Sequence, residues 1–236
     1  MAIHESLEAL LLQAGARFDV GFEPLDIDGV PLQVLGINNM QAHLDKLIAS
    51  KSIHNPLKDL PLWAKVWPAS FVLGRFLRKF EPQGKTVLEV GAGCGITGCI
   101  AARYGFSHVT VSDIVPDALL FAKANSVRNG LQERMDVRHI DIATAQLPEK
   151  FDIIAASEML YLDELHRPLL KFIERHLAAG GKAVLCTDWA RRKPHFVKLA
   201  EKNYAVTSGH VGVRSHDAEN GEQRRMYEIH IVERRA

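Results

Sequence analysis

The fold of this chain is decided by Thr86-Val87-Leu88-Glu89-Val90-Gly91-Ala92-Gly93-Cys94-Gly95-Ile96-Thr97-Gly98. The first five residues predict a buried strand, and the residues after the glycines predict a helix. A strand that leads through a glycine-rich turn into a helix lets backbone approach a ligand closely and aims helix amides at it. The stretch therefore predicts a ligand-binding turn.

The spacing of the glycines separates two cofactor classes. A dinucleotide site needs Gly-x-Gly-x-x-Gly starting directly after the strand. Counted from the strand end, the glycines are Gly91, Gly93 and Gly95, and Ile96 stands where the third glycine is required. Glu89 would also face a pyrophosphate with the same sign of charge, whereas it suits a ligand that carries ammonium and sulfonium groups. The pattern disfavours a nicotinamide-dependent oxidoreductase.

Past Pro82, short apolar runs alternate with helical segments, which is typical of a parallel sheet with crossover helices. The predicted strands are residues 86–90, 108–112, 137–142, 151–156 and 182–186. The predicted helices are residues 96–104, 116–129 and 163–177, with a short turn at 143–146. Two β-rich runs, 204–213 and 226–232, predict an antiparallel hairpin at one sheet edge. The expected fold class is α/β: a Rossmann-like, doubly wound, mostly parallel seven-stranded sheet with an antiparallel C-terminal hairpin.

The first 60 residues predict an N-terminal extension made of a helix and extended segments. The predicted elements are a helix over residues 5–14, extended backbone over 18–37 with a turn at Asp28-Gly29, and a short helix over 40–49. A polar, proline-containing connector over 50–61 and a helix over 69–80 follow. We therefore expect two units, residues 1–60 and 61–236, the second of which holds the glycine turn.

The composition excludes several classes of protein. Hydrophobic residues make up 47% and charged residues 24%, and 29 Lys+Arg against 28 Asp+Glu give a net charge of +1. These values are typical of a soluble globular protein and predict neither a nucleic acid nor a membrane partner. Cys94, Cys99 and Cys186 show no metal-binding spacing, and the histidines form no ligand pair. We expect reduced thiols, no metal and a cytoplasmic location.

Acidic residues also end the next two predicted strands. Asp113 ends the second predicted strand and Asp141 the third, although acidic residues are common at strand ends. With Glu89, this pattern resembles the acidic-x-Gly-x-Gly-x-Gly turn of class I S-adenosylmethionine methyltransferases. The resemblance implies S-adenosyl-L-methionine as cofactor, with Asp113 on both ribose hydroxyls and Asp141 beside the adenine. The cofactor-binding residues it implies are Trp67, Glu89, Gly91, Gly93, Gly95, Asp113, Ile114, Asp141, Ile142 and Ser157.

A narrower resemblance covers about residues 60 to 190. Three segments, residues 63–69, 89–98 and 156–161, together resemble the seven-strand protein-lysine methyltransferases. In that family a tryptophan before the first core helix lines the cofactor site, and an acidic-x-x-aromatic motif follows the fourth strand; these match Trp67 and the pair Glu158 and Tyr161. The chain departs from many members by Glu158 in place of Asp. It also has Asp141 in place of a tryptophan, so its adenine pocket must be built differently.

Glu158 and Tyr161 are the candidate catalytic residues. Enzymes that methylate planar amides resemble one another in an Asn-Pro-Pro-aromatic motif, and this chain has no proline there. A carboxylate and a phenol suit an amine, because Glu158 can accept from it and Tyr161 can pack against its stem or methylated cation. A lysine amine, with a free pKa of about 10.4, must lose its proton first. Glu158 favours the charged form, so it helps orientation more than deprotonation.

The predicted activity is N-methylation of a lysine side chain in a protein. One alternative is methylation of a small-molecule amine, with the first 60 residues as a lid; another is a non-catalytic, cofactor-binding interaction module. Plainer interpretations of single residues also stay open: Trp63 and Trp67 as core aromatics, and Glu158 as a carboxylate at a helix N-terminus. Trp189 is a candidate for the acceptor groove, and the run from Arg191 to Lys193 is typical of a solvated surface patch.

Overall fold

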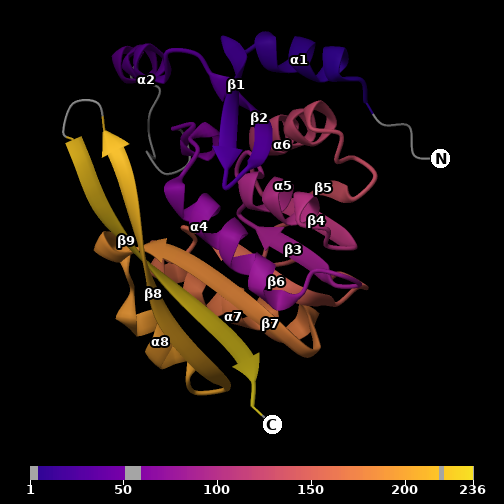
Figure 1. Cartoon of the computed structure of the whole chain (residues 1–236), viewed down its shortest axis with the longest axis vertical. Coiled ribbons are helices and arrows are strands. Elements are labelled where there is room, and N and C mark those ends of the chain that lie inside the picture. Colours follow the sequence, from indigo (N-terminus) through magenta and orange to yellow (C-terminus); the bar gives the residue numbers. More distant parts are fainter. Residues whose placement is uncertain (1–4, 51–59, 218–220, 236) are drawn as a thin grey trace.

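The computed structural model describes residues 5–50, 60–217 and 221–235. They form a two-stranded hairpin and a seven-stranded sheet flanked by helices (Figure 1). The strands are β1 Val20–Ile27, β2 Val30–Ile37, β3 Thr86–Val90, β4 His108–Asp113, β5 Met135–His139, β6 Phe151–Ser157, β7 Leu177–Asp188, β8 Tyr204–Asp217 and β9 Gly221–Arg234. The α-helices are α1 Leu7–Gly15, α2 Met40–Ala49, α4 Pro68–Leu77, α5 Ile96–Arg103, α6 Pro116–Arg128, α7 Asp163–His176 and α8 Pro194–Ala200. Single 3-10 turns are η1 Leu62–Ala64, η2 Arg78–Phe80 and η3 Trp189–Arg191.

The strand order of the large sheet is β5-β4-β3-β6-β7-β9-β8. The strands from β5 to β7 are parallel, whereas β9 runs antiparallel to both β7 and β8. This arrangement confirms the predicted doubly wound α/β fold and its C-terminal hairpin. The chain first builds outward from β3 through β4 to β5 and then returns to place β6 on the other side of β3. Ligands bind at such a reversal, outside the carboxyl ends of the strands.

Three predicted boundaries differ from the structure. The third strand ends at His139, not at 142, because Asp141 begins a turn: its carboxylate accepts from Ala143 N at 2.8 Å and its carbonyl from Ala145 N at 2.8 Å. The last parallel strand runs from Leu177, five residues earlier than expected, through an irregular start. The hairpin strands are longer than the apolar runs, because ladder hydrogen bonds use backbone and continue through polar residues.

The large sheet separates two hydrophobic layers. Successive residues of β3 alternate between them, with Val87 on one face and Leu88 on the other. Helices α4, α5 and α6 cover the first face, and α7 and α8 cover the second. The first layer also includes buried residues of α1, β1 and β2, such as Leu10 and Leu35. The N-terminal extension therefore shares the hydrophobic core of the sheet.

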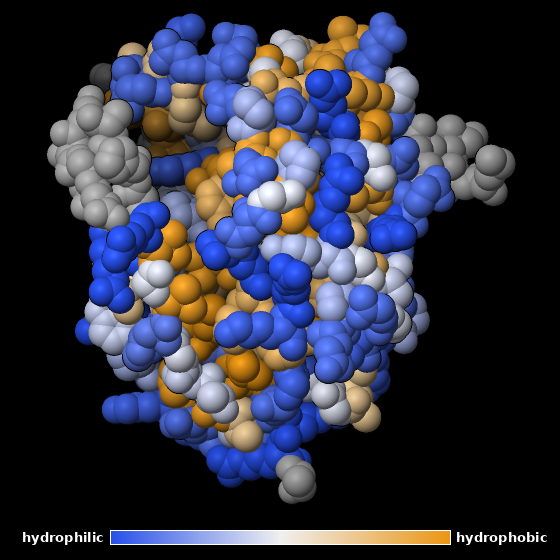
Figure 2. Space-filling model, in the orientation of Figure 1, coloured by the Kyte–Doolittle hydropathy of each residue, from blue (hydrophilic) through white to orange (hydrophobic). Residues whose placement is uncertain are grey.

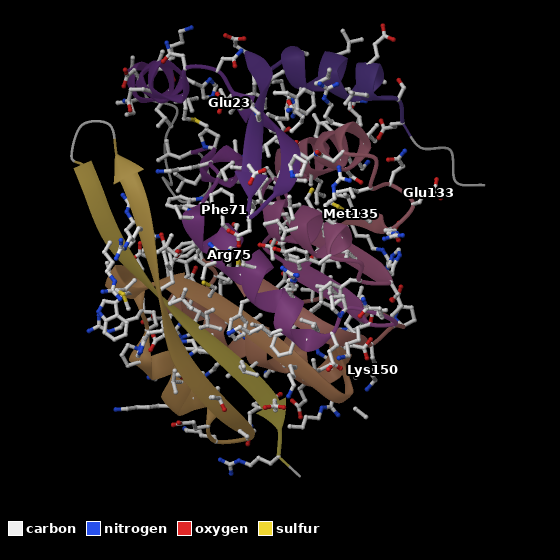
Figure 3. The ribbon with its side chains drawn as sticks, in the orientation of Figure 1. Glu23, Phe71, Arg75, Glu133, Met135 and Lys150 are labelled. Atoms are coloured by element: carbon white, nitrogen blue, oxygen red, sulfur yellow. The ribbon has the colours of Figure 1, made fainter. Side chains whose placement is uncertain are left out.

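The hairpin β1–β2 closes through a tight turn. Asp28 and Gly29 both have positive φ, 53° and 79°, which is the geometry of a two-residue type I′ turn, and Asp26 accepts a hydrogen bond from Gly29 N at 2.8 Å. Asp28 also pairs with Arg75 of α4, 2.6 Å away, at the surface. Arg75 is labelled in Figure 3, one helical turn beyond Phe71. The predicted turn at Asp28-Gly29 is thus confirmed.

Two asparagines, one in α6 and one directly after it, are hydrogen-bond partners of the β2 backbone. Asn129 accepts from Gln33 N at 2.9 Å and donates to Gln33 O at 2.8 Å. Asn125, one turn earlier and fully buried, accepts from Leu35 N at 2.7 Å. Its amide nitrogen donates to Cys94 O, inside the glycine turn, at 2.9 Å. One side chain therefore joins the N-terminal hairpin to the ligand-binding turn.

The surface carries both polar and apolar residues. Figure 2 shows polar residues interspersed with apolar ones over the face that it presents. Within the described ranges, no helix has the length and the apolar character needed to cross a membrane. Cys94, Cys99 and Cys186 are free and buried, and burial raises the pKa of Cys94 to about 12. These thiols are poor nucleophiles.

The asparagine link predicts a large stability effect. Asn125→Ala leaves Leu35 N–H and Cys94 C=O buried without a partner, at about 1 to 3 kcal/mol each, so we expect the free energy of unfolding to fall by about 2 to 6 kcal/mol. Asn203→Ala, at an exposed site after α8, is the matched control and should change it by less than about 0.5 kcal/mol. Denaturant unfolding measures both. Equal midpoints would contradict the assigned link.

Candidate active site

The candidate site lies where β3, β4, β6 and β7 end at the carboxyl edge of the sheet. The glycine turn leaves β3 there, and Asp113, Ser157 and Asp188 end the other three strands. The sequence predicted this juxtaposition, since carboxyl ends of parallel strands share one edge.

Gly91, Gly93 and Gly95 all have positive φ, at 61°, 55° and 78°. Side chains are also excluded sterically: a Cβ on Gly93 would lie 2.6 Å from Trp63 O, and one on Gly91 would overlap Met159 Sδ. Glycine is therefore required here by backbone conformation and by protein atoms already present. From the sequence we expected the close approach of a ligand and a positive φ in this turn; the protein contacts of Trp63 and Met159 were not foreseen.

Two carboxylates hold the backbone of this turn. Glu89, at the fourth position of β3, accepts from Gly98 N at 2.7 Å through Oε2. Asp113, at the end of β4, accepts from Gly93 N at 2.8 Å through Oδ2 and from Val115 N at 2.9 Å through Oδ1. The amides of the turn are thus fixed from two neighbouring strands.

Glu89 has no exposed surface, so it supports the turn from beneath and does not face an open groove. Burial raises its pKa to about 8, although the Gly98 N–H bond lowers it. Its second oxygen, Oε1, has no hydrogen-bond partner among the described residues. A buried carboxylate oxygen without a partner fits a ligand that brings N–H donors or positive charge, directly or through water.

The outer side of the turn is set by residues that follow β4 and β5. Asp113 retains 8% of its surface, and the next side chain, Ile114, is 56% exposed at the sheet edge. Such an exposed apolar side chain suits the face of a flat ring. The Asp141 carboxylate bonds within its own turn, and Ile142 is buried in the α7 layer. The roles of Asp141 and Ile142 in cofactor binding stay predictions.

The two tryptophans before α4 have different surroundings. Trp63 packs edge-on against Phe18 and Phe121, with ring centroids 5.7 and 4.9 Å away, so it is a core aromatic. Trp67 precedes α4, and its indole donates to Leu62 O at 2.9 Å. Ser157, also expected at the site, is buried, with its hydroxyl 3.1 Å from that of Ser70 on α4.

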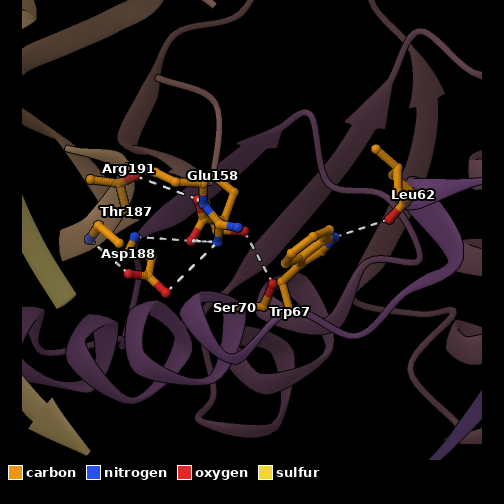
Figure 4. Close-up of polar contacts among 9 residues, drawn as sticks. Leu62, Trp67, Ser70, Glu158, Thr187, Asp188 and Arg191 are labelled. Atoms are coloured by element: carbon orange, nitrogen blue, oxygen red, sulfur yellow. Dashed lines mark hydrogen bonds and ion pairs between the residues drawn. The ribbon is translucent and has the colours of Figure 1, made fainter. Parts of the chain in front are cut away.

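Glu158 adopts a left-handed backbone conformation, with φ at 54°, which is strained for a residue other than glycine. Its Oε1 accepts from Asp188 N at 2.9 Å and contacts Arg191 Nη2 at 2.9 Å. Its Oε2 accepts from Arg191 Nε at 3.0 Å and lies 3.5 Å from Thr187 Oγ1 (Figure 4). Both oxygens of this carboxylate thus have partners within the protein, and its role toward an amine stays a prediction.

Arg191 is the site residue that sequence reasoning missed. Its guanidinium pairs with Glu158 and lies 4.9 Å from the ring centre of Trp67. The neighbouring Arg192 instead covers the Trp189 ring at 4.1 Å, and Lys193 pairs with Asp163 at 3.0 Å. Three adjacent cations thus have three different partners. The sequence could have pointed to Arg191 by its position alone, because it closely follows the predicted strand that becomes β7, at the sheet edge where ligands bind.

Tyr161 and Trp189 lie at the outer rim of this edge, each 37% exposed. Burial and the Asp113 carboxylate both raise the pKa of the Tyr161 phenol, which keeps it protonated. The ring centre of Trp189 lies 4.6 Å from that of His210 on β8. The rim is therefore aromatic next to the partly exposed ion pair of Glu158 and Arg191.

Comparison with protein families identifies the family to which this chain belongs. A family model described as "Lysine methyltransferase" matches residues 52–203, more than half of the chain. The chain belongs to the lysine methyltransferase family. The resemblance expected from the turn and from the Glu158–Tyr161 motif is confirmed.

Two relatives of this lysine methyltransferase carry their activity in their names. The protein N-lysine methyltransferase METTL21A of Danio rerio is 34% identical over 163 residues, which are 65% of this chain and 73% of that protein. The electron transfer flavoprotein beta subunit lysine methyltransferase of Mus musculus is 33% identical over 138 residues, 58% of this chain. The matched part spans about half, 53%, of that mouse protein.

Solved structures agree on the fold. The ribosomal protein L11 methylase of Lactobacillus delbrueckii subsp. bulgaricus has a TM-score of 0.55 at 20% identity, covering 72% of this chain and 81% of that one. A TehB-like SAM-dependent methyltransferase of Corynebacterium glutamicum has a TM-score of 0.53 at 17% identity, covering 83% and 98%. Both neighbours are named as methyl-transferring enzymes, and the likeness to them shows the fold of this chain.

S-adenosylmethionine is the cofactor of this methyltransferase, and the residues present fit it. Asp113 and Ile114 would hold the nucleoside, since they offer a carboxylate and an exposed apolar surface side by side. The unpartnered Glu89 oxygen would face the cationic end from beneath the turn. When bound, the cofactor supplies a methyl group on a positively charged sulfur.

Gly93→Ala tests the turn. A Cβ there meets the Trp63 carbonyl and is strained by a φ of 55°, so we expect affinity for S-adenosylmethionine to fall at least tenfold. Gly84→Ala is the matched control, because its φ is 74° but its Cβ meets nothing within 4 Å. Calorimetric titration, with circular dichroism to verify folding, should show near-parent affinity for the control. Equal affinities in the two folded variants would show that the Trp63 contact does not shape the site.

The buried Glu89 predicts a pH dependence of stability. Its folded pKa of about 8 lies above the ordinary value of 4.5, so the folded state holds a proton that the unfolded state gives up. This contribution is complete below pH 4.5 and is lost as pH rises toward 8. Glu89→Gln should remove it, so the stability of the parent relative to the variant should fall between pH 5 and 8 in denaturant unfolding without cofactor. A constant difference would contradict the assignment.

Proposed function

We propose that this enzyme transfers a methyl group from S-adenosylmethionine to the ε-amine of a lysine in a protein. The observation that carries the proposal is the end of β6, where a paired, largely covered Glu158 is followed after two residues by the rim aromatic Tyr161. A planar amide would need donors and acceptors aligned in one plane, and no proline aims carbonyls here. A flexible aliphatic stem suits aromatic walls instead.

A protein substrate is supported by the surroundings of this edge. Tyr161 and Trp189 are exposed at its rim, as a surface that admits a side chain from outside requires. Within the extension, α1 and the β1–β2 hairpin are integrated in the core through buried residues such as Leu10 and Leu35, so these elements are not placed as a movable lid. Both relatives are named for protein lysines. The three buried free cysteines support a reducing compartment such as the cytoplasm.

The chain's own residues then have distinct tasks. Asp113 and the glycine turn bind and orient the nucleoside end. Tyr161 packs against the lysine stem and excludes water from the amine, which favours its neutral form. Trp67 and Arg191 form the wall around Glu158. This division separates cofactor binding from acceptor positioning.

The experiment that tests the proposal uses S-adenosylmethionine labelled in its methyl group. The full chain is incubated with a cell lysate, and the labelled products are fractionated and hydrolysed. Label in a protein, recovered as methyl-lysine, supports the proposal. Label in the small-molecule fraction would replace it with amine methylation of a metabolite. Binding without any transfer would indicate a non-catalytic module.

Tyr161 provides a graded test. Tyr161→Ala removes the wall against the stem, so we expect single-turnover methyl transfer to the labelled lysate protein to fall at least about 10²-fold, as a 1 Å misplacement can do. Tyr161→Phe keeps the ring and loses at most a hydrogen bond of about 0.5 to 1.5 kcal/mol, so it serves as the conservative control. Cofactor affinity should stay within a few-fold in both. A Phe variant as slow as the Ala variant would assign the function to the hydroxyl.

A further inference from the structure

A carboxylate without a counter-charge at the acceptor site would disfavour the neutral amine that the reaction requires. Only a neutral amine has the lone pair that attacks a methyl group, whereas a nearby carboxylate stabilises the charged ammonium and raises its pKa. Glu158 is next to Met159, whose side chain lies against Gly91 of the cofactor turn. The Glu158 carboxylate accepts from Asp188 N at the end of β7, so its charge lies at the same carboxyl edge of the sheet as the cofactor turn. An unpaired Glu158 would oppose deprotonation.

The structure supplies a counter-charge at this point. Arg191 contacts both oxygens of Glu158, at 3.0 Å through Nε and 2.9 Å through Nη2, which is a two-pronged ion pair. The Glu158 side chain is 11% exposed and the Arg191 side chain 40% exposed, so the carboxylate is the more shielded partner of the pair. The guanidinium is held on its other side by the Trp67 ring. The counter-charge is thus positioned by Glu158 after β6 and by Trp67 before α4.

We propose that Arg191 is a positioning residue that cancels the charge of Glu158, so that the acceptor amine is held in its neutral form. This inference rests on the proposed transfer to an amine. Glu158 then acts through its ion pair with Arg191, which fixes η3 and Trp67 around the acceptor. It does not bind an ammonium group directly. The arrangement explains why a carboxylate is tolerated where an amine must attack.

The other charged and titratable groups around the pair do not replace Arg191. Asp188, at the end of β7, lies 3.9 Å from Arg191 and adds negative charge. Burial raises the pKa of Cys186 and of Tyr227, so both stay neutral near pH 7. Lys65 lies 4.7 Å from the Trp67 ring but does not contact Glu158 among the described interactions. Removing Arg191 therefore leaves a net negative site.

The test uses two cofactor analogues and needs no knowledge of the acceptor. Sinefungin carries an amine on carbon where S-adenosylmethionine carries the methyl group on sulfur, and S-adenosylhomocysteine has neither. The ratio of their dissociation constants reports how the acceptor site treats an ammonium. Calorimetric titration from pH 6 to 9 also gives the pH at which the preference for sinefungin ends, which is the pKa of the bound amine.

Opposite shifts are expected from the two halves of the pair. Arg191→Gln should favour sinefungin over S-adenosylhomocysteine by about tenfold or more and raise the pKa of the bound amine by about one unit or more, since an opposite charge within 4 to 6 Å shifts a pKa by about 1 to 3 units. Glu158→Gln should shift the ratio the other way. Arg191→Lys keeps the charge and should stay near the parent. Arg192→Gln, beside Trp189, is the matched control and should change neither.

Several outcomes would overturn the inference. If Arg191→Gln weakens both analogues equally, Arg191 only supports the fold of the site; if neither the ratio nor the bound-amine pKa moves, the charge of Glu158 does not reach the acceptor. Circular dichroism verifies folding, and the lysine variant provides the rescue if the glutamine variant is unstable. Failure of the proposed function would instead appear as absent methyl-lysine label while these binding shifts persist.

Discussion

The site depends on backbone amides of one glycine turn being held by two buried carboxylates. Asp113 binds Gly93 N from β4, and Glu89 binds Gly98 N from β3. A turn with three positive φ angles is costly to order, and each carboxylate–amide bond offsets part of that cost. Because both carboxylates come from strands of a parallel sheet, the sheet order itself sets the shape of the cofactor site.

The same turn is also held from the N-terminal side. Trp63 O accepts from Cys94 N at 3.1 Å, and Asn125 connects Cys94 O to Leu35 of the β1–β2 hairpin. The hairpin shares the core beneath α4 and α6. The N-terminal extension therefore helps to support the ligand-binding turn. The buried side-chain amide of Asn125 connects the two.

Local sequence patterns predicted the helices, strands and turns, whereas contacts between residues far apart in the sequence determined the side-chain partners in the site. The glycine turn, the carboxylate that ends β4 and the hairpin turn at Asp28-Gly29 follow from periodicity and turn chemistry, and the structure places them as expected. The pairing of Arg191 with Glu158 joins residues 33 positions apart. The basic run from Arg191 to Lys193 does not by itself predict which of its side chains contacts the site. Asp141 was expected at a strand end, but its carboxylate serves its own turn. Element placement was thus more predictable than side-chain partners.

The most direct test of the account is calorimetric titration of S-adenosylmethionine into the parent chain and into Asp113→Ala. Asp113 bonds the turn at Gly93 N and retains exposed surface toward the groove. The account predicts saturable binding by the parent and a loss of roughly 10- to 150-fold in the variant, as for hydrogen bonds to a charged group of about 1.5 to 3 kcal/mol. No binding by the parent, or equal affinity in a folded variant, would contradict it.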